Sequence, residues 1–297
     1  MISLPKSVDP EELLINIREL SWEVSKILNS YNQISADKDK LRKKLKIQNL
    51  KTGPVTSADI EVSELIKRRI SNKYESISWE YLSEEDKKYI YNKKFKSKWV
   101  WIIDPLDGTK DFINNTGEYA MHLALTYEKK VIIGVVLIPS KNQLWIFFKG
   151  KGTWCENLNS SANISINNNS KEMNEIKILT SKSHMNKELS FLLEKLKPKE
   201  IIGMGSIGYK VASILRGEAD LYISYSLPKG SCPKDWDIAA PLSLIEGAGG
   251  HFTDISGGNL EFLKERNYDQ GGILIASINI NHMKICQEIS NIIKNNN

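Results

Sequence analysis

Apolar side chains recur at three- and four-residue steps in the stretch that follows Asp9 and Pro10. The positions are Leu13, Ile17, Leu20, Val24, Ile27, Leu28 and Tyr31. This spacing predicts a long amphipathic helix whose apolar stripe packs against the core. A second helix is predicted from Ser57 or Asp59 to near Asn72, where apolar residues lie four apart. Asp59 is therefore expected in the first turn of a helix.

Runs of β-branched and aromatic residues predict strands in the middle of the chain. The run at 99–103 is expected to form a buried strand that ends in an abrupt turn at Asp104-Pro105. Three further runs, separated by short polar segments, predict an antiparallel meander at 120–127, 131–138 and 144–148.

The second half of the chain alternates between strand and helix patterns. The predicted strands are 176–180, 221–224 and 251–253, and the predicted helices are 187–196, 206–216 and 238–248. Such alternation implies an α/β sandwich. The Asn- and Ser-rich stretch at 157–175 is the best boundary, so we expect an N-terminal α+β half at 1–156 and a C-terminal α/β half at 176–297.

Composition excludes several classes of protein. With 297 residues, 41% hydrophobic and 26% charged, the chain is neither disordered, collagen-like nor membrane-spanning. Its three cysteines form no disulfide framework and no metal-ligand spacing, and no export signal is evident, so a cytoplasmic location is expected. The net charge of +5 is modest, and the densest basic segment, 37–46, mixes signs like a solvated helix or loop edge. We expect neither nucleic acid nor a membrane as a partner.

The strongest chemical signal is the run Asp104-Pro105-Leu106-Asp107-Gly108-Thr109. It places two carboxylates three residues apart directly after a hydrophobic strand. Proline fixes the backbone there, and glycine lets a ligand approach the main chain. Because two carboxylates that converge on one point repel each other, a bound divalent cation such as Mg²⁺ is the simplest explanation. The alternative is a capped turn that leads into a helix.

Further acidic residues are ambiguous when taken singly. Glu84 and Glu85 belong to a Glu-Glu-Asp run, which is usually a solvated surface. Asp237 follows Trp236 at the start of a predicted helix, where a carboxylate can serve merely as a cap. Each of these residues, like Asp59, is in isolation more typical of a structural role.

Four segments taken together resemble the inositol monophosphatase superfamily of Mg²⁺-dependent, lithium-sensitive phosphatases. The segments are LSEED, WIIDPLDGTKDF, KDWDIAAP and EGAGGHFTDISGG, and the match runs from the first helix to near residue 280. The resemblance implies an α/β fold, a layered αβαβα sandwich of the inositol monophosphatase and fructose-1,6-bisphosphatase type. The segments 181–184 and 205–210 resemble those of 3′(2′),5′-bisphosphate nucleotidases, which remove the 3′-phosphate of adenosine 3′,5′-bisphosphate.

The resemblance also implies a set of metal ligands and a cofactor of two or three Mg²⁺ ions. Glu84, Asp104 and the main-chain carbonyl of Leu106 are implied to hold one ion. Asp104, Asp107 and Asp237 are implied to hold a second. Loss of Asp104 is expected to abolish turnover, because both ions share it.

Catalytic residues are implied in the same way. Thr109 and Asp59 are expected to form a hydroxyl–carboxylate pair that orients the attacking water, while Glu84 and Thr109 accept or relay its proton. The main-chain N–H groups of Gly108 and Thr109 open a helix after the turn and are suited to hold phosphate oxygens.

Substrate contacts rest on the nucleotidase-like segments. The resemblance implies that Ser181, His184, Ser206, Lys210 and Asp237 bind substrate, with Lys210 suited to a second phosphate. A surface histidine and a solvent-facing helical lysine are the alternatives for His184 and Lys210. At 223–224 the chain has Ile-Ser where many relatives have Pro-Arg.

We therefore expect a Mg²⁺-dependent phosphoric monoester hydrolase of sulfur metabolism, a 3′(2′),5′-bisphosphate nucleotidase whose partner is a small-molecule phosphate ester. Adenosine 3′,5′-bisphosphate would yield AMP and phosphate, and 3′-phosphoadenosine 5′-phosphosulfate is a further possible substrate. The alternatives are an inositol or other sugar-phosphate phosphatase of the same superfamily and a catalytically silent nucleotide-binding protein. The expected assembly is a monomer or a homodimer.

Overall fold

The computed structural model describes residues 4–33, 45–50, 53–86, 94–157, 160–163, 171–227, 231–264 and 268–295. Most of the basic segment 37–46 and parts of the expected boundary at 157–175 lie outside these ranges. Within the described part of the chain, no helix is both long and apolar enough to cross a membrane.

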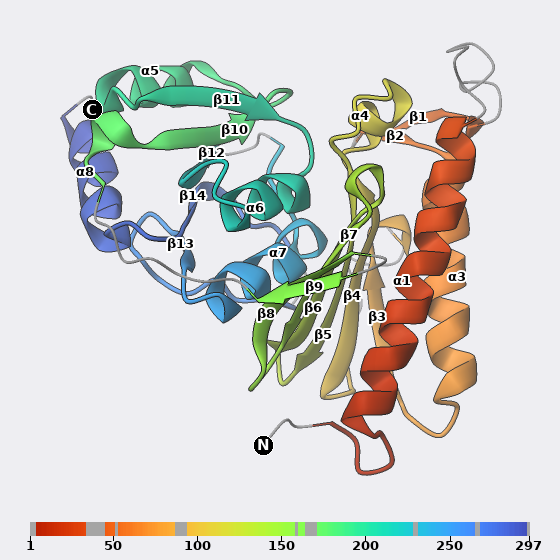
Figure 1. Cartoon of the computed structure of the whole chain (residues 1–297). Coiled ribbons are helices and arrows are strands. Elements are labelled where there is room, and N and C mark those ends of the chain that lie inside the picture. The colour runs from red at the N-terminus through yellow and green to blue at the C-terminus, as the bar shows by residue number, and fades with distance from the viewer. Residues whose placement is uncertain are drawn as a thin grey trace.

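A seven-stranded sheet forms the first half of the fold. Its strands follow one another in chain order, with β3 parallel to β4 and all later neighbours antiparallel. They are β3 (Glu80–Ser83), β4 (Trp99–Asp107), β5 (Ala120–Tyr127), β6 (Lys130–Ile138), β7 (Gln143–Phe148), β8 (Gly152–Asn157) and β9 (Ser160–Asn163). Helices α1 (Pro10–Gln33) and α3 (Ser57–Lys73) cover one face of this sheet, and the short hairpin of β1 (Gln48–Leu50) and β2 (Gly53–Val55) lies near their ends (Figure 1).

A five-stranded sheet forms the second half, in the order β11-β10-β12-β14-β13. Its strands are β10 (Lys177–Ser181), β11 (Glu200–Met204), β12 (Leu221–Ser226), β13 (His251–Asp254) and β14 (Gly272–Ser277). Helices α6 (Ile207–Leu215) and α7 (Asp235–Gly247) lie between the two sheets, whereas α5 (Lys187–Leu196) and α8 (His282–Lys294) lie on the outer face (Figure 1).

Three apolar clusters join these layers. The first packs α1 and α3 against one face of the large sheet, and includes the buried Trp101. The second joins its other face to α6, α7 and the small sheet, and the third packs the small sheet against α5 and α8. Since each sheet is apolar on both faces, each needs a helix layer on both sides. The expected αβαβα sandwich is confirmed (Figure 1).

Most predicted elements form within a few residues of their expected bounds, including strand 120–127 and helix 187–196. Seven were not predicted: strands β1, β2, β8, β9, β11 and β14 and helix α8. One predicted end is wrong, because β4 continues through Pro105 to Asp107. The strand passes Pro105 by a bulge against β5, where proline is tolerated because no ladder hydrogen bond from its nitrogen is needed. The division into two halves stays a prediction.

His282 lies buried where α8 begins against the small sheet. Its Nε2 atom is 2.7 Å from Thr253 Oγ1, and its Nδ1 atom is 2.7 Å from Ser277 Oγ. The ring centroid is 5.1 Å from that of His251. Burial and, secondarily, the charge of His251 lower the pKa of His282 to about 4.

Acid is therefore expected to destabilise the fold through His282. Between the unfolded pKa of about 6.5 and the folded pKa of about 4, the unfolded chain binds more protons, so the free energy of unfolding falls as pH is lowered. Urea titrations should show a loss of about 2 kcal/mol from pH 7 to pH 4.5 that the variant His282→Asn lacks. If the free energy of unfolding changed equally with pH in both proteins, His282 would not be the cause, since other acid-sensitive groups are common to both.

Candidate active site

Asp104 lies at the bulge of β4 and is fully buried. Its Oδ1 atom accepts a hydrogen bond from the Leu106 nitrogen at 3.0 Å, while its Oδ2 atom has no hydrogen-bond partner among the described residues. Burial raises the pKa of Asp104 well above its usual range, and the charges of Glu84, Asp107 and Asp237 raise it further. A buried carboxylate oxygen without a donor is costly, so this atom needs another source of positive charge when ionised.

The N-terminus of α6 holds Asp107. Its Oδ2 atom accepts hydrogen bonds from Ser206 Oγ at 2.6 Å, from the Ile207 nitrogen at 2.6 Å and from the Gly208 nitrogen at 3.3 Å. The two N–H donors belong to the start of a helix, where unpaired N–H groups favour an anion. The Ser206 hydroxyl also accepts from the Tyr209 nitrogen, so it caps α6 and donates to Asp107 at once.

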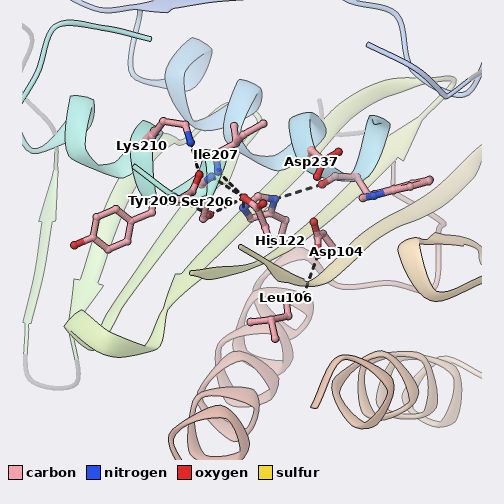
Figure 2. A network of polar contacts seen from close by, with 12 residues as sticks. Asp104, Leu106, His122, Ser206, Ile207, Tyr209, Lys210 and Asp237 are labelled. Carbon is pink, nitrogen blue, oxygen red and sulfur yellow. Dashed lines mark hydrogen bonds and ion pairs between the residues drawn. The ribbon is translucent and has the colours of Figure 1, made fainter. Parts of the chain in front are cut away.

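Asp237 occupies the first turn of α7, where its Oδ2 atom accepts a hydrogen bond from the Lys234 nitrogen at 2.5 Å. The capping role considered from sequence is thus real. The residue also faces the other acids, because one oxygen each of Asp104, Asp107 and Asp237 lies within 4.8 Å of the other two. Figure 2 shows Asp104 and Asp237 approaching each other from the sheet and from α7.

Glu84 begins a single 3₁₀ turn directly after β3. Since Ser83 pairs with Ile103 in parallel register, Glu84 and Asp104 come next on adjacent strands. The charge of Glu84 raises the pKa of both Asp104 and Asp237, which places it beside the cluster. It does not belong to the triplet within 4.8 Å. The structure therefore gathers four acids from segments far apart in the sequence.

Asp59, in the first turn of α3, lies close to Thr109, which follows β4 and Gly108. Asp59 is buried at the third position of α3, and its Oδ2 atom accepts from the Thr56 nitrogen at 2.8 Å and from Thr56 Oγ1 at 2.5 Å. Its Oδ1 atom lies 3.4 Å from Thr109 Oγ1, which is also 3.1 Å from the Leu106 carbonyl oxygen. Burial raises the pKa of Asp59 to about 6, against the opposing effect of the Thr56 hydrogen bonds. Asp59 thus serves as a helix cap and also faces the threonine.

Gly108 links the acidic strand to the short helix α4 (Thr109–Ile113). Its φ of 86° lies in the left-handed region, which favours glycine. A Cβ atom at this position would also lie 2.9 Å from the Glu118 carbonyl oxygen. The glycine in the motif is therefore needed for the turn itself, besides any close approach of a ligand.

The expected substrate contacts divide into an exposed pair and a buried pair. His184 is exposed, and its Nδ1 atom is 3.1 Å from Ser181 Oγ just beyond β10. Ser206 and Lys210 are each only 1% exposed. Lys210 Nζ donates to the carbonyl oxygens of Met204, at 3.2 Å, and Gly205, and burial lowers the pKa of Lys210 to about 8. The solvent-facing alternative for Lys210 is wrong because α6 is packed between the two sheets.

Sequence reasoning missed two residues at this site, Glu118 and His122. Glu118 Oε2 accepts from Lys182 Nζ at 2.6 Å and from the Gly205 nitrogen at 2.9 Å, and so ties α6 to the large sheet. His122 lies fully buried in β5, between Met121 and Leu123. A histidine inside an otherwise apolar strand is the signal that could have revealed it.

Three comparisons place the chain among known proteins. The model of the inositol monophosphatase family matches residues 9–294. The chain is 29% identical over 225 residues to the 3′(2′),5′-bisphosphate nucleotidase CysQ of Escherichia coli K12, covering 75% of this chain and 85% of that protein. It is 30% identical over 211 residues to CysQ of Buchnera aphidicola, covering 70% of this chain and 74% of that protein.

Solved structures support the fold. The Thermotoga maritima IMPase superposes with a TM-score of 0.72 at 22% identity, covering 96% of this chain and 99% of that chain. A structure of SaIMPase-II with bound 2′AMP has a TM-score of 0.69 at 17% identity, covering 94% of this chain and 93% of that chain. At these identities the superpositions establish shared architecture, so the chemistry must be argued from the residues.

Proposed function

Because the chain belongs to the inositol monophosphatase family, we propose that it is a Mg²⁺-dependent phosphatase that hydrolyses the 3′-phosphate of adenosine 3′,5′-bisphosphate. The products are AMP and phosphate, and 3′-phosphoadenosine 5′-phosphosulfate is a further candidate substrate. The names of the CysQ relatives support the choice of a nucleotide over an inositol ester.

One observation carries the proposal: three carboxylates converge within 4.8 Å, and the Oδ2 atom of one of them, Asp104, is buried without a hydrogen-bond partner among the described residues. Carboxylate and carbonyl oxygens are the ligands that Mg²⁺ takes in proteins. The residues present therefore fit the ion. Glu84, Asp104 and the Leu106 carbonyl would hold one Mg²⁺, and Asp104, Asp107 and Asp237 a second, of two or three in all.

When bound, Mg²⁺ supplies Lewis acidity and lowers the pKa of water, which phosphate-ester hydrolysis needs because its uncatalysed barrier is very high. The side chains of Asp59 and Thr109 orient the attacking water. Since the pKa of Asp59 is about 6, its carboxylate is ionised at pH 7 and can accept the hydrogen bond of the Thr109 hydroxyl. The threonine oxygen is then free to accept a hydrogen bond from water. Glu84 and Thr109 accept the proton that the attacking water loses, and the departing 3′ oxygen takes up a proton from solvent. The N–H groups of Gly108 and Thr109 bind phosphate oxygens.

We propose that the nucleotide lies toward Ser181 and His184, which form an exposed hydrogen-bonded pair at the end of β10. Burial lowers the pKa of His184, and the charges of Lys110 and Lys210 lower it further against the opposing charge of Asp107, so two cationic side chains lie near this region. A second phosphate is attracted to such a positive surface. In this proposal the buried residues Ser206 and Lys210 lie beneath the bound substrate. Asp237 contacts the substrate next to the Mg²⁺ ion that Asp237 would hold.

The test is phosphate release from adenosine 3′,5′-bisphosphate and inositol 1-phosphate, each with Mg²⁺ and with EDTA. We expect Mg²⁺-dependent phosphate release that is at least about tenfold faster from the nucleotide than from the inositol ester. A tenfold difference in rate corresponds to about 1.4 kcal/mol of transition-state binding. Equal or faster release from the inositol ester would overturn the nucleotide assignment and favour the inositol phosphatase. No release from any phosphomonoester would favour a silent binding protein instead.

A further inference from the structure

His122 lies across the sheet from the bulged strand. It pairs with Asp104 in the register of β4 and β5, and its side chain is only 1% exposed. Its strand neighbours on the chain, Met121 and Leu123, are fully buried apolar residues. A buried polar side chain needs polar contacts, and those of His122 are made with Asp107 of the acidic cluster and with the main chain beside Asp237.

The imidazole contacts both segments that carry the outer carboxylates. Its Nε2 atom lies 3.4 Å from Asp107 Oδ2, and its Nδ1 atom lies 3.4 Å from the carbonyl oxygen of Trp236. Trp236 directly precedes Asp237 in the first turn of α7. Figure 2 shows the ring between the sheet and the two helices, with dashed contacts on both sides. His122 therefore spans the gap between Asp107 and the start of α7.

Gly208 leaves the room that the imidazole occupies. A Cβ atom on Gly208 would overlap His122 Nε2 and would lie 2.8 Å from Val136 Cγ1. The Gly208 nitrogen itself donates to Asp107 Oδ2. The helix start, the carboxylate and the ring are therefore in tight contact, and a movement of the ring must move the others.

The ring fills the space between Asp107 and the Trp236 carbonyl. Both of its neighbours, a carboxylate and a carbonyl oxygen, are acceptors. The Nδ1 atom is within hydrogen-bond reach of the Trp236 carbonyl, whereas Nε2 lies beside Asp107 without a hydrogen bond among the described residues.

We propose that His122 is a positioning residue that fixes the placement of the Asp107 and Asp237 carboxylates, and so sets how tightly this site holds a divalent cation. The inference rests on the proposed function for the presence of the cation and requires no particular substrate. Residues that orient metal ligands typically change metal affinity by 10- to 100-fold when replaced.

The experiment measures binding of Mn²⁺, detected as free Mn²⁺ by electron paramagnetic resonance, to the full chain. His122→Leu keeps bulk but removes both polar contacts, and it is expected to weaken Mn²⁺ binding about 10- to 100-fold. His122→Asn keeps a donor near the position of Nδ1 for the Trp236 carbonyl, and it should retain affinity within about threefold. The control is His251→Leu on β13, an exposed histidine, which should bind Mn²⁺ like the wild type.

A second readout separates positioning from general damage. In His122→Leu, the Mg²⁺ concentration for half-maximal phosphate release should rise with the loss of Mn²⁺ affinity, while kcat at saturating Mg²⁺ stays within a few-fold. If His122→Leu does not fold, Gly208→Ala gives the same test, because its methyl group must displace the imidazole from Asp107.

A folded His122→Leu with wild-type Mn²⁺ affinity would overturn the inference, as would equal losses in the Leu and Asn variants. A wild-type chain that binds no Mn²⁺ overturns it together with the cation site. A wild-type chain that binds Mn²⁺ but releases no phosphate overturns only the proposed function, because the Mn²⁺ affinities of the His122 variants can still be compared.

Discussion

Replacing Asp104 by asparagine is expected to reduce phosphate release by roughly 10³-fold or more, because this carboxylate is shared by both proposed Mg²⁺ sites. The same change should stabilise the protein in EDTA. Burial and three neighbouring acids raise the pKa of Asp104, which means that its charged form is unfavourable in the folded chain. A neutral amide removes that repulsion. We expect the melting temperature in EDTA to rise by about 2–4 °C per kcal/mol gained.

Thermal melts with and without MgCl₂ provide the measurement. The wild-type melting temperature should rise with Mg²⁺, by an amount equivalent to about 2.7 kcal/mol at 100 times the dissociation constant, whereas Asp104→Asn should respond far less. Asp86→Asn is the matched control, because Asp86 lies in the turn with Glu84 but pairs with Lys67 at 2.6 Å. An Asp104→Asn variant that keeps both turnover and the Mg²⁺ response would falsify the proposed metal centre.

Thr109→Val is expected to lower kcat by about 10²- to 10⁴-fold, the usual contribution of a group that directs proton transfer. Valine matches the shape of threonine but cannot donate to Asp59 Oδ1 or accept a hydrogen bond from water. Thr109→Ser keeps the hydroxyl and should stay within about tenfold of the wild type. Mn²⁺ affinity should be unchanged in both variants, since the threonine side chain is not a proposed ligand.

Steady-state phosphate release at saturating Mg²⁺ measures these effects. Thr116→Val is the control, since the Thr116 hydroxyl also donates to an aspartate, Asp111 at 2.7 Å, in the same loop region. Wild-type activity in Thr109→Val would leave Asp59 only its structural role beside Thr56 in the capping box of α3.

The sequence predicted the fold well where the local pattern of apolar residues was strong. Strand 120–127 and helix 187–196 have the predicted bounds, because the nearly continuous apolar run of the first and the helical apolar periodicity of the second agree with their burial. Strand β11 was not predicted because it is an edge strand whose residues are exposed or half-buried. Its pairing with β10 is what defines it as a strand. Helix α8 was predictable from the sequence, because Ile285 and Ile289 lie four residues apart, and both are buried in the structure.

The candidate site also combines features that the sequence predicted with features that it did not. The motif from Asp104 to Thr109 indicated a cation site from the sequence, since its acids follow a buried strand. Its bulge was not predictable, because local signals at Asp-Pro favour a strand end, and only pairing with β5 carries the strand past Pro105. Likewise, Lys210 reads as an ordinary helical lysine until α6 is packed between two sheets.

By itself, the sequence determined which residues have the chemistry: the acids, the hydroxyls and the alternating strands and helices that carry them. Only the tertiary structure decided that Asp104, Asp107 and Asp237 face one another and that His122 bridges the segments bearing two of them. The reason is physical. Local propensities act over a few residues, whereas the repulsion between buried carboxylates and the contacts that offset it exist only when strands and helices remote in the chain pack together.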